Sequence, residues 1–218
     1  MRSLAQPATL KAAAMASAVT AAAGYPQLAI WIDRPGSAPA LCFMLFATGI
    51  FLWSFVFAWH ENGSGRRIFF PGFHPSLWLA ATLLGLAGAF VLHRFMDPAM
   101  REFHLATFPT NLKEWLAITL FTISFEQLFV CFAPFAFFIR LFRKRKLAAA
   151  QTVLFGVFIV ILKLSQTHDP IPFSLDVQLV ILRMVSFSIT VFLYLRGGVF
   201  AVMWWILLLQ TRHLPGLL

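Results

Sequence analysis

Long apolar stretches, separated by short turn-rich breaks, constrain the fold of this chain more than any other feature. An apolar stretch of about 20 residues spans the hydrocarbon core of a bilayer as a helix. Hydrophobic residues make up 60% of the 218 residues and charged residues only 11%, with a mean hydropathy of +0.82. A water-soluble protein of this size cannot hide so much apolar surface in one core. We therefore predict an all-α fold, a polytopic transmembrane helix bundle.

The breaks divide the chain into about seven apolar segments. These are residues 10–31, 38–60, 76–95, 113–141, 147–166, 173–195 and 198–211. The linkers between them are rich in proline and glycine, and the longest runs from 94 to 111. We predict a single integral membrane domain over residues 1–218, without a soluble domain.

The net charge of +9 would suggest nucleic-acid binding in a soluble protein. Here most cations lie in short loops beside apolar segments, where the positive-inside rule accounts for them. The densest run, RLFRKRK at 140–146, is therefore expected on the cytoplasmic side of a bacterial inner membrane. With seven helices the N-terminus is then also cytoplasmic, and we expect no nucleic acid among the partners.

The cysteines and histidines give no clear metal or cofactor motif. Cys42 and Cys131 have no metal-ligand spacing, so we predict no metal site. His60 and His93 are the histidines placed best for a haem or chlorin ligand, but both end apolar segments and we interpret them as interfacial. No cofactor is predicted, although a hydrophobic surface leaves room for bound lipid, quinone or pigment.

Ionisable residues inside the apolar segments are more informative. Glu126, Lys163 and Arg183 would each cost about 2.5–3.5 kcal/mol if unpaired at the bilayer centre, so each is expected to be buried in the bundle with a partner. We predict an ion pair between Glu126 and Lys163, which lie on consecutive segments. Arg183 has Asp176 two turns earlier on the same helical face, and we interpret it as a structural residue that snorkels or pairs locally.

Three segments, in order, carry a family resemblance. The stretch from Glu126 and Gln127 to Cys131 resembles a Glu-Glu-x-x-x-Arg motif, and LFGVFIVILKL at 154–164 resembles a helix ending in Phe-x-x-x-His, with Lys163 at the histidine position. YLRGG at 194–198 is similar to a Tyr-Leu-Arg-x-Gly signature that precedes His-x-x-x-Asn, where this chain has Leu207 and Thr211. These motifs are those of the CAAX protease and bacteriocin-processing (CPBP, or Abi) family of intramembrane proteases. The resemblance implies a CPBP-like core over residues 113–211, preceded by accessory helices in residues 1–112.

The resemblance also implies what has been lost. In the family a glutamate is thought to activate water, while histidines and an asparagine stabilise the transition-state oxyanion. In this chain the arginine position is Cys131, the histidine positions are Lys163 and Leu207, and the asparagine position is Thr211. We therefore predict no catalytic residue, and a fold retained after the catalytic constellation degenerated.

The leading hypothesis is a non-catalytic CPBP-like protein that serves other integral membrane proteins as an accessory subunit, assembly factor or scaffold. Trp204–Trp205 and the run Phe135–Phe142 are the expected contact surfaces. One alternative is an active intramembrane protease with an altered site that uses Glu126 as base. Another is a pigment- or quinone-associated subunit of an energy-converting membrane complex.

Overall fold

A computed structural model describes residues 4–32, 37–69, 74–103, 108–166 and 171–217. Over these ranges the chain is helical and contains no β-strand, so the prediction of an all-α fold is confirmed. The α-helices are α1 Pro7–Trp31, α2 Ala38–Phe55, α3 Glu61–Ser64, α4 Pro75–Val91, α5 Asp97–Glu102, α6 Leu112–Phe121, α7 Ala133–Phe142, α8 Arg145–Ser165 and α9 Phe173–Gln210. Between or after them lie the π-helical turns η1 Val56–His60, η2 Leu92–Met96, η3 Thr122–Glu126 and η4 Leu128–Phe132, and the 3-10 helix η5 Thr211–Gly216.

Several of these elements join end to end into longer helices. Five helical stretches of the described chain are long and apolar enough to cross a membrane: Pro39–Ser64, Pro75–Glu102, Leu112–Phe142, Arg145–Ser165 and Phe173–Gly216. Their number and hydropathy indicate an integral membrane protein. The alanine-rich helix α1 is not among them, which fits the small contribution of alanine to partitioning into lipid.

One predicted boundary was wrong, and another agrees with the structure. The segment expected to end at residue 95 continues to Glu102, because the π turn η2 carries the helix onward and Pro98 occupies the first turn of α5, where its missing N–H is not needed. The break predicted between the segments 173–195 and 198–211 is present, because α9 consists of two helices that meet at a kink at Gly198.

Local signals explain where the central helix begins and ends. The Asn111 side chain accepts a hydrogen bond from the N–H of Glu114 at 3.0 Å, and the Glu114 carboxylate accepts one from the N–H of Thr110 at 2.7 Å. This reciprocal cap fixes the start of α6. The helix then runs through Pro134 to Phe142, and Arg143 ends it in the left-handed conformation with φ of 55°.

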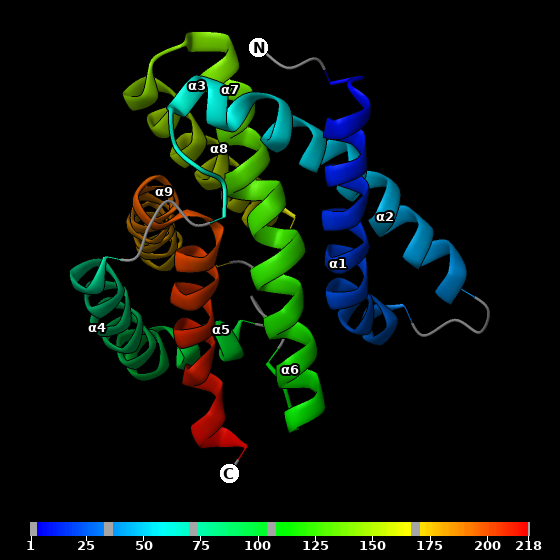
Figure 1. The fold of residues 1–218 in the computed structure, drawn as a ribbon. Coiled ribbons are helices and arrows are strands. Elements are labelled where there is room, and N and C mark those ends of the chain that lie inside the picture. Colours follow the sequence, from blue (N-terminus) through cyan, green and yellow to red (C-terminus); the bar gives the residue numbers. More distant parts are fainter. Residues whose placement is uncertain (1–3, 33–36, 70–73, 104–107, 167–170, 218) are drawn as a thin grey trace.

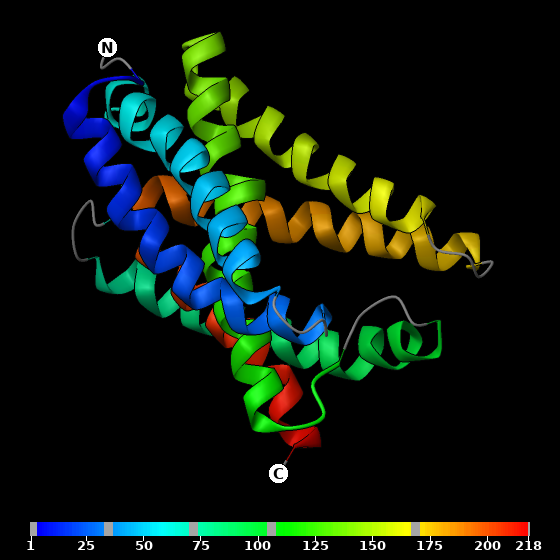
Figure 2. The same ribbon diagram turned by 90° about the vertical axis from the view of Figure 1, so that its right-hand side faces the viewer.

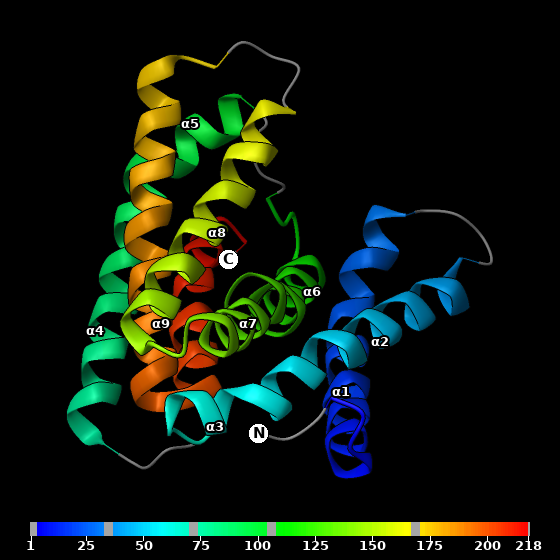
Figure 3. The same cartoon turned by 90° about the horizontal axis from the view of Figure 1, so that it is seen from above.

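The helices form three groups (Figure 3). The helix made of α6 and α7 runs through the middle, with the α1–α2 hairpin on one side and α4, α8 and α9 on the other. Figure 2 shows α8 and the first part of α9 running side by side, steeply crossed by the α6–α7 helix. The central helix and the second part of α9 therefore hold most of the core, including Leu128, Phe132 and Val202.

A change of direction at Gly198 shapes the second half of the bundle. Gly198 has φ of 71° and ψ of −166°, and it divides α9 into a first arm, 173–197, and a second arm, 199–210. The break exposes backbone N–H groups at the start of the second arm. Val199 donates to the carbonyl of Ile68 at 2.9 Å, and Phe200 donates to that of Phe69 at 3.4 Å.

The segment after α3 thus caps the second arm of α9, and Figure 1 shows it descending from α3 to the turn. Capping satisfies N–H groups that would otherwise be orphaned at a helix start. A Cβ on Gly198 would lie 2.5 Å from the Phe69 oxygen and 2.6 Å from the Ile68 oxygen. Only glycine permits both this backbone conformation and this close approach.

Candidate polar site along the central helix

Each π turn adjoins or contains a polar side chain within a candidate membrane-crossing stretch. The turn η1 ends at His60, η2 is followed directly by Asp97, η3 ends at Glu126, and η4 follows Gln127 and contains Cys131. Single π turns inside α-helices are rare and occur often at functional sites, because they re-aim side chains and loosen the backbone ladder. The irregular turns therefore indicate where to look for a site.

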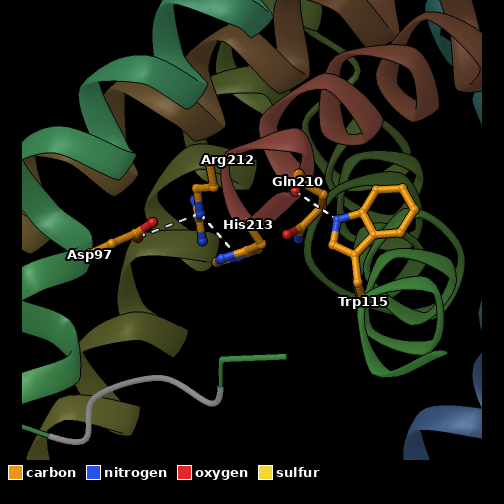
Figure 4. A network of polar contacts seen from close by, with 5 residues as sticks. All are labelled: Asp97, Trp115, Gln210, Arg212 and His213. Carbon is orange, nitrogen blue, oxygen red and sulfur yellow. Dashed lines mark hydrogen bonds and ion pairs between the residues drawn. The ribbon is translucent and has the colours of Figure 1, made fainter. Parts of the chain in front are cut away.

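The best-connected polar group lies where α5 meets the end of α9 (Figure 4). Arg212 places Nε 3.6 Å from Oδ1 of Asp97 and donates from the same atom to Nε2 of His213 at 3.2 Å. The Asp97 side chain is only 4% exposed and that of Arg212 14%. This is the only ion pair between the residues that the structure describes. Glu126 and Arg183 lie within electrostatic range of Arg212, so the group extends toward the central helix.

Aromatic rings enclose this polar group. The ring of Phe108 packs edge-on against His213 with a centroid separation of 5.4 Å, and the guanidinium of Arg101 lies 4.5 Å from the Phe108 centroid. From the central helix, Trp115 donates its indole N–H to the carbonyl of Gln210 at 2.9 Å, which ties α6 to the end of α9. These contacts hold the ends of three helices together.

The residues at the expected motif positions do not converge. Glu126 is half-buried and makes no hydrogen bond or ion pair with other described residues. Gln127 and Cys131 are buried, and Oε1 of Gln127 has no partner. Leu207 and Thr211 are partly buried, and the Thr211 hydroxyl donates to the carbonyl of Leu208 at 2.6 Å, so it is occupied locally.

The predicted burial of Lys163 and its ion pair with Glu126 were wrong. Lys163 is exposed, and the two side chains form no ion pair in the described structure. The physical reason is position: α8 ends at Ser165, so Lys163 lies in its last turn, where the long side chain reaches the membrane boundary by snorkelling. Glu126 lies midway along the helix Leu112–Phe142.

Arg183 and Asp176 are both half-buried on the first arm of α9. They form no ion pair with each other, because Asp97–Arg212 accounts for the ion pairing within the described ranges. Oδ1 of Asp176 is buried without a hydrogen-bond partner. The predicted local ion pair between Arg183 and Asp176 is therefore absent from the described structure. Arg183 lies within electrostatic range of Arg212 instead.

His60 lies four residues before the end of the apolar stretch Pro39–Ser64, and it faces the protein interior. The side chain is fully buried, with its ring centroid 4.7 Å from that of Tyr194 and 5.6 Å from that of Phe135. Neither ring nitrogen of His60 nor the Tyr194 hydroxyl has a hydrogen-bond partner among the described residues. His93, in contrast, lies on the π turn η2, where no side chain is buried. Across the described part of the chain, no three His, Cys, Asp or Glu side chains gather closely enough to hold a metal ion.

The expected contact surfaces lie partly inside the protein. Phe135 and Trp205 belong to the core, and Trp204 donates its indole N–H to the hydroxyl of Thr82 at 2.9 Å. The rings that do reach the surface include Phe137, which is 43% exposed, and Phe51, which is 60% exposed. An aromatic surface therefore exists, but on α2 and α7.

Sequence reasoning missed the group around Asp97 and Arg212. Both residues were assigned to the ends of segments or to a loop, where charged residues are ordinary. The sequence Asp97-Pro98 fits a helix start as well as a turn, and this was the one local signal that α5 continues the helix.

No protein-family model, curated protein or solved structure matches this chain.

Proposed function

We propose that the chain is a non-catalytic, CPBP-like membrane protein that acts as an accessory subunit, assembly factor or scaffold for other integral membrane proteins. The proposal includes a CPBP-like core over residues 113–211 in a seven-helix bundle, a bacterial inner membrane location and a cytoplasmic N-terminus. It includes no nucleic-acid partner and no resident cofactor. It does not depend on a metal site.

The environment of Glu126 is the observation that carries the proposal. A glutamate that activates water needs hydrogen-bond donors nearby that face the developing negative charge. At the motif positions, Cys131 is a weak hydrogen-bond donor and Leu207 cannot donate at all. Lys163 is exposed at the end of α8. The hydroxyl of Thr211 is already bound to a backbone carbonyl. Within the described residues, none of the side chains at the motif positions therefore supplies Glu126 with the donors that the family's mechanism uses.

An aromatic surface across α2 and α7 supports the binding role. The rings of Phe51 and Phe55 lie 4.7 Å apart, and Phe55 stacks on Trp59 at 4.9 Å. Phe137 of α7 continues the row, at 6.2 Å from Phe55 and 6.5 Å from Trp59. Rings that are already ordered lose little conformational entropy when a partner packs on them. We call Phe51, Phe55, Trp59 and Phe137 the aromatic face, and we propose that it receives transmembrane helices of the partner.

The test is extraction of the chain from its native membrane in a mild detergent, followed by measurement of mass and subunit composition. The expected result is a defined complex that Phe51→Ala with Phe137→Ala dissociates. The matched control is Phe90→Ala with Phe95→Ala, because these rings are 67% and 61% exposed on α4 and η2. Migration as a single chain, or equal loss in both variants, would refute the proposed role.

The same preparation separates the two alternatives. Glu126→Gln should leave the complex intact, and no cleavage of a hydrophobic peptide should depend on Glu126. Glu126-dependent cleavage would instead support an altered protease. Absorption bands that travel with the complex and vanish when the aromatic face is changed would favour a pigment- or quinone-associated subunit.

A further inference from the structure

An open groove lies at the kink of α9, away from the polar group around Arg212. It has a volume of about 380 Å³, which lies within the size range of small-ligand sites. The walls come from three places: the segment after α3, the first turns of α4, and the end of the first arm of α9. What this groove binds does not depend on the proposed function.

The rim of the groove is cationic. Arg66, His74 and Arg196 line it, and none of the described lining residues is acidic. Neither arginine forms an ion pair with another described residue, so no carboxylate of the described chain neutralises either guanidinium group directly. Ser76 adds a hydroxyl at the same rim. Planar guanidinium groups bind phosphate through two parallel hydrogen bonds, and a hydroxyl adds a further donor.

The remainder of the lining is apolar. Leu77, Ala80 and Phe192 extend from the rim along α4 and α9, and Phe192 is 53% exposed. The guanidinium of Arg196 lies 5.9 Å from the centroid of the Phe192 ring, so charge and apolar surface meet at one point. The candidate membrane-crossing stretch that contains α4 begins at Pro75, next to His74, and Arg196 lies at the end of the first arm of α9, so the cations lie at helix ends and the apolar lining along the helices.

The backbone holds the two arginines in a fixed relation. The N–H groups of Val199 and Phe200 donate hydrogen bonds to the carbonyls of Ile68 and Phe69. These bonds join the segment that contains Arg66 to the kink that follows Arg196. Gly197 packs closely against α4, since a Cβ there would lie 3.0 Å from Leu77 Cδ2. A site assembled on such a framework needs little reorganisation to bind a ligand.

From this arrangement we propose that the groove binds the phosphate group of an anionic phospholipid, with the headgroup between Arg66 and Arg196 and an acyl chain along Leu77 and Phe192. Cations that no carboxylate of the described chain neutralises directly, next to an apolar wall, match an amphiphilic anion. Free phosphate shares the headgroup chemistry but gains nothing from the apolar wall. The two sources of phosphate are therefore distinguishable.

The experiment measures lipid binding to the purified full chain in neutral detergent by native mass spectrometry. The probes are palmitoyl-oleoyl phosphatidylglycerol, the phosphatidylcholine with the same acyl chains, and inorganic phosphate. We expect phosphatidylglycerol to bind more tightly than phosphatidylcholine. Each arginine near an anionic lipid contributes a factor of about 5 in affinity, so Arg66→Gln with Arg196→Gln should weaken phosphatidylglycerol binding about 30-fold.

The control variant, Arg67→Gln with Lys11→Gln, removes the same charge from exposed residues outside the groove and should leave binding within about 2-fold. Equal binding by wild type and groove variant, or equal loss in both variants, overturns the site. Displacement of the lipid by inorganic phosphate at comparable concentration overturns the lipid assignment.

A second measurement does not depend on the variants folding. Phosphatidylglycerol with a photoreactive acyl chain is crosslinked to the wild-type chain in vesicles, and the labelled peptides are identified. Labels concentrated on residues 76–80 and 192–196 support the site. Labels spread evenly over the exposed apolar helices, or equal labelling by the matched phosphatidylcholine, refute it.

Discussion

Replacement of Gly198 by alanine should destabilise the protein far more than an ordinary glycine substitution. The residue has φ of 71° and ψ of −166°, a conformation that costs a side-chain-bearing residue about 1–3 kcal/mol. The new Cβ would also lie 2.5 Å from the Phe69 oxygen and 2.6 Å from the Ile68 oxygen, both backbone atoms that cannot move separately from their segment. Real Cβ contacts are not this short.

Relief of the clash requires residues 68–69 to retreat, which breaks the hydrogen bonds from Val199 and Phe200. A backbone group left without a partner away from water costs about 1–3 kcal/mol. With two such groups and the backbone strain, the expected loss is about 3–9 kcal/mol, a large part of the roughly 5–15 kcal/mol that a typical domain has. We expect a correspondingly lower midpoint in a denaturant titration of the purified protein, followed by tryptophan fluorescence.

Gly65→Ala is the matched control. Gly65 also has positive φ, 67°, but a Cβ there would meet nothing within 4 Å. Its substitution therefore costs only the left-handed backbone term, about 1–2 kcal/mol. If Gly198→Ala costs no more free energy of unfolding than Gly65→Ala, then the close approach of residues 68–69 does not restrict the side chain at position 198.

Three further experiments test the polar residues by the same unfolding measurement. Arg212→Met leaves Asp97 as an unpaired buried carboxylate and should cost about 3–5 kcal/mol, whereas addition of Asp97→Leu should restore most of that loss; no recovery in the double variant would contradict the pairing. Tyr194→Phe removes a buried hydroxyl without a partner, so the free energy of unfolding should stay within about 0.5 kcal/mol or rise; a loss above about 1 kcal/mol would reveal a hydrogen bond. Lys163→Met and Glu126→Gln should show additive effects within about 0.5 kcal/mol, since the two residues make no contact; measurable coupling would restore the ion pair.

The helical class followed from the sequence because its causes are local. Apolar length and the positions of proline and glycine decide where a membrane helix begins and ends. The pair Gly197-Gly198 marked a break between predicted segments, and α9 changes direction there. The contact between this break and residues 68–69 could not be predicted, because long-range backbone hydrogen bonds leave no local pattern in the sequence.

Burial was harder to predict, for a reason specific to membranes. In water, apolar residues face inward, but lipid tails are as apolar as a protein core, so hydrophobicity no longer separates inside from outside. Phe135 and Trp205 were expected on the surface and lie in the core, while Phe51 and Phe90 are exposed. His60 precedes the polar run ENGSG and was therefore interpreted as interfacial, although it is packed against Tyr194.

The π turns change which residues of the central helix share a face. An α-helix turns about 100° per residue, and each π turn accommodates one extra residue, so side chains beyond it are rotated by about that angle relative to a regular helix. Two such turns follow each other at 122–126 and 128–132, so a face drawn from Trp115 to Phe135 at regular spacing is wrong by about 200°. That rotation is large enough to exchange the inner and outer faces. Regular spacing from Trp115 therefore does not predict the face on which Phe135 lies, and Phe135 is buried in the core.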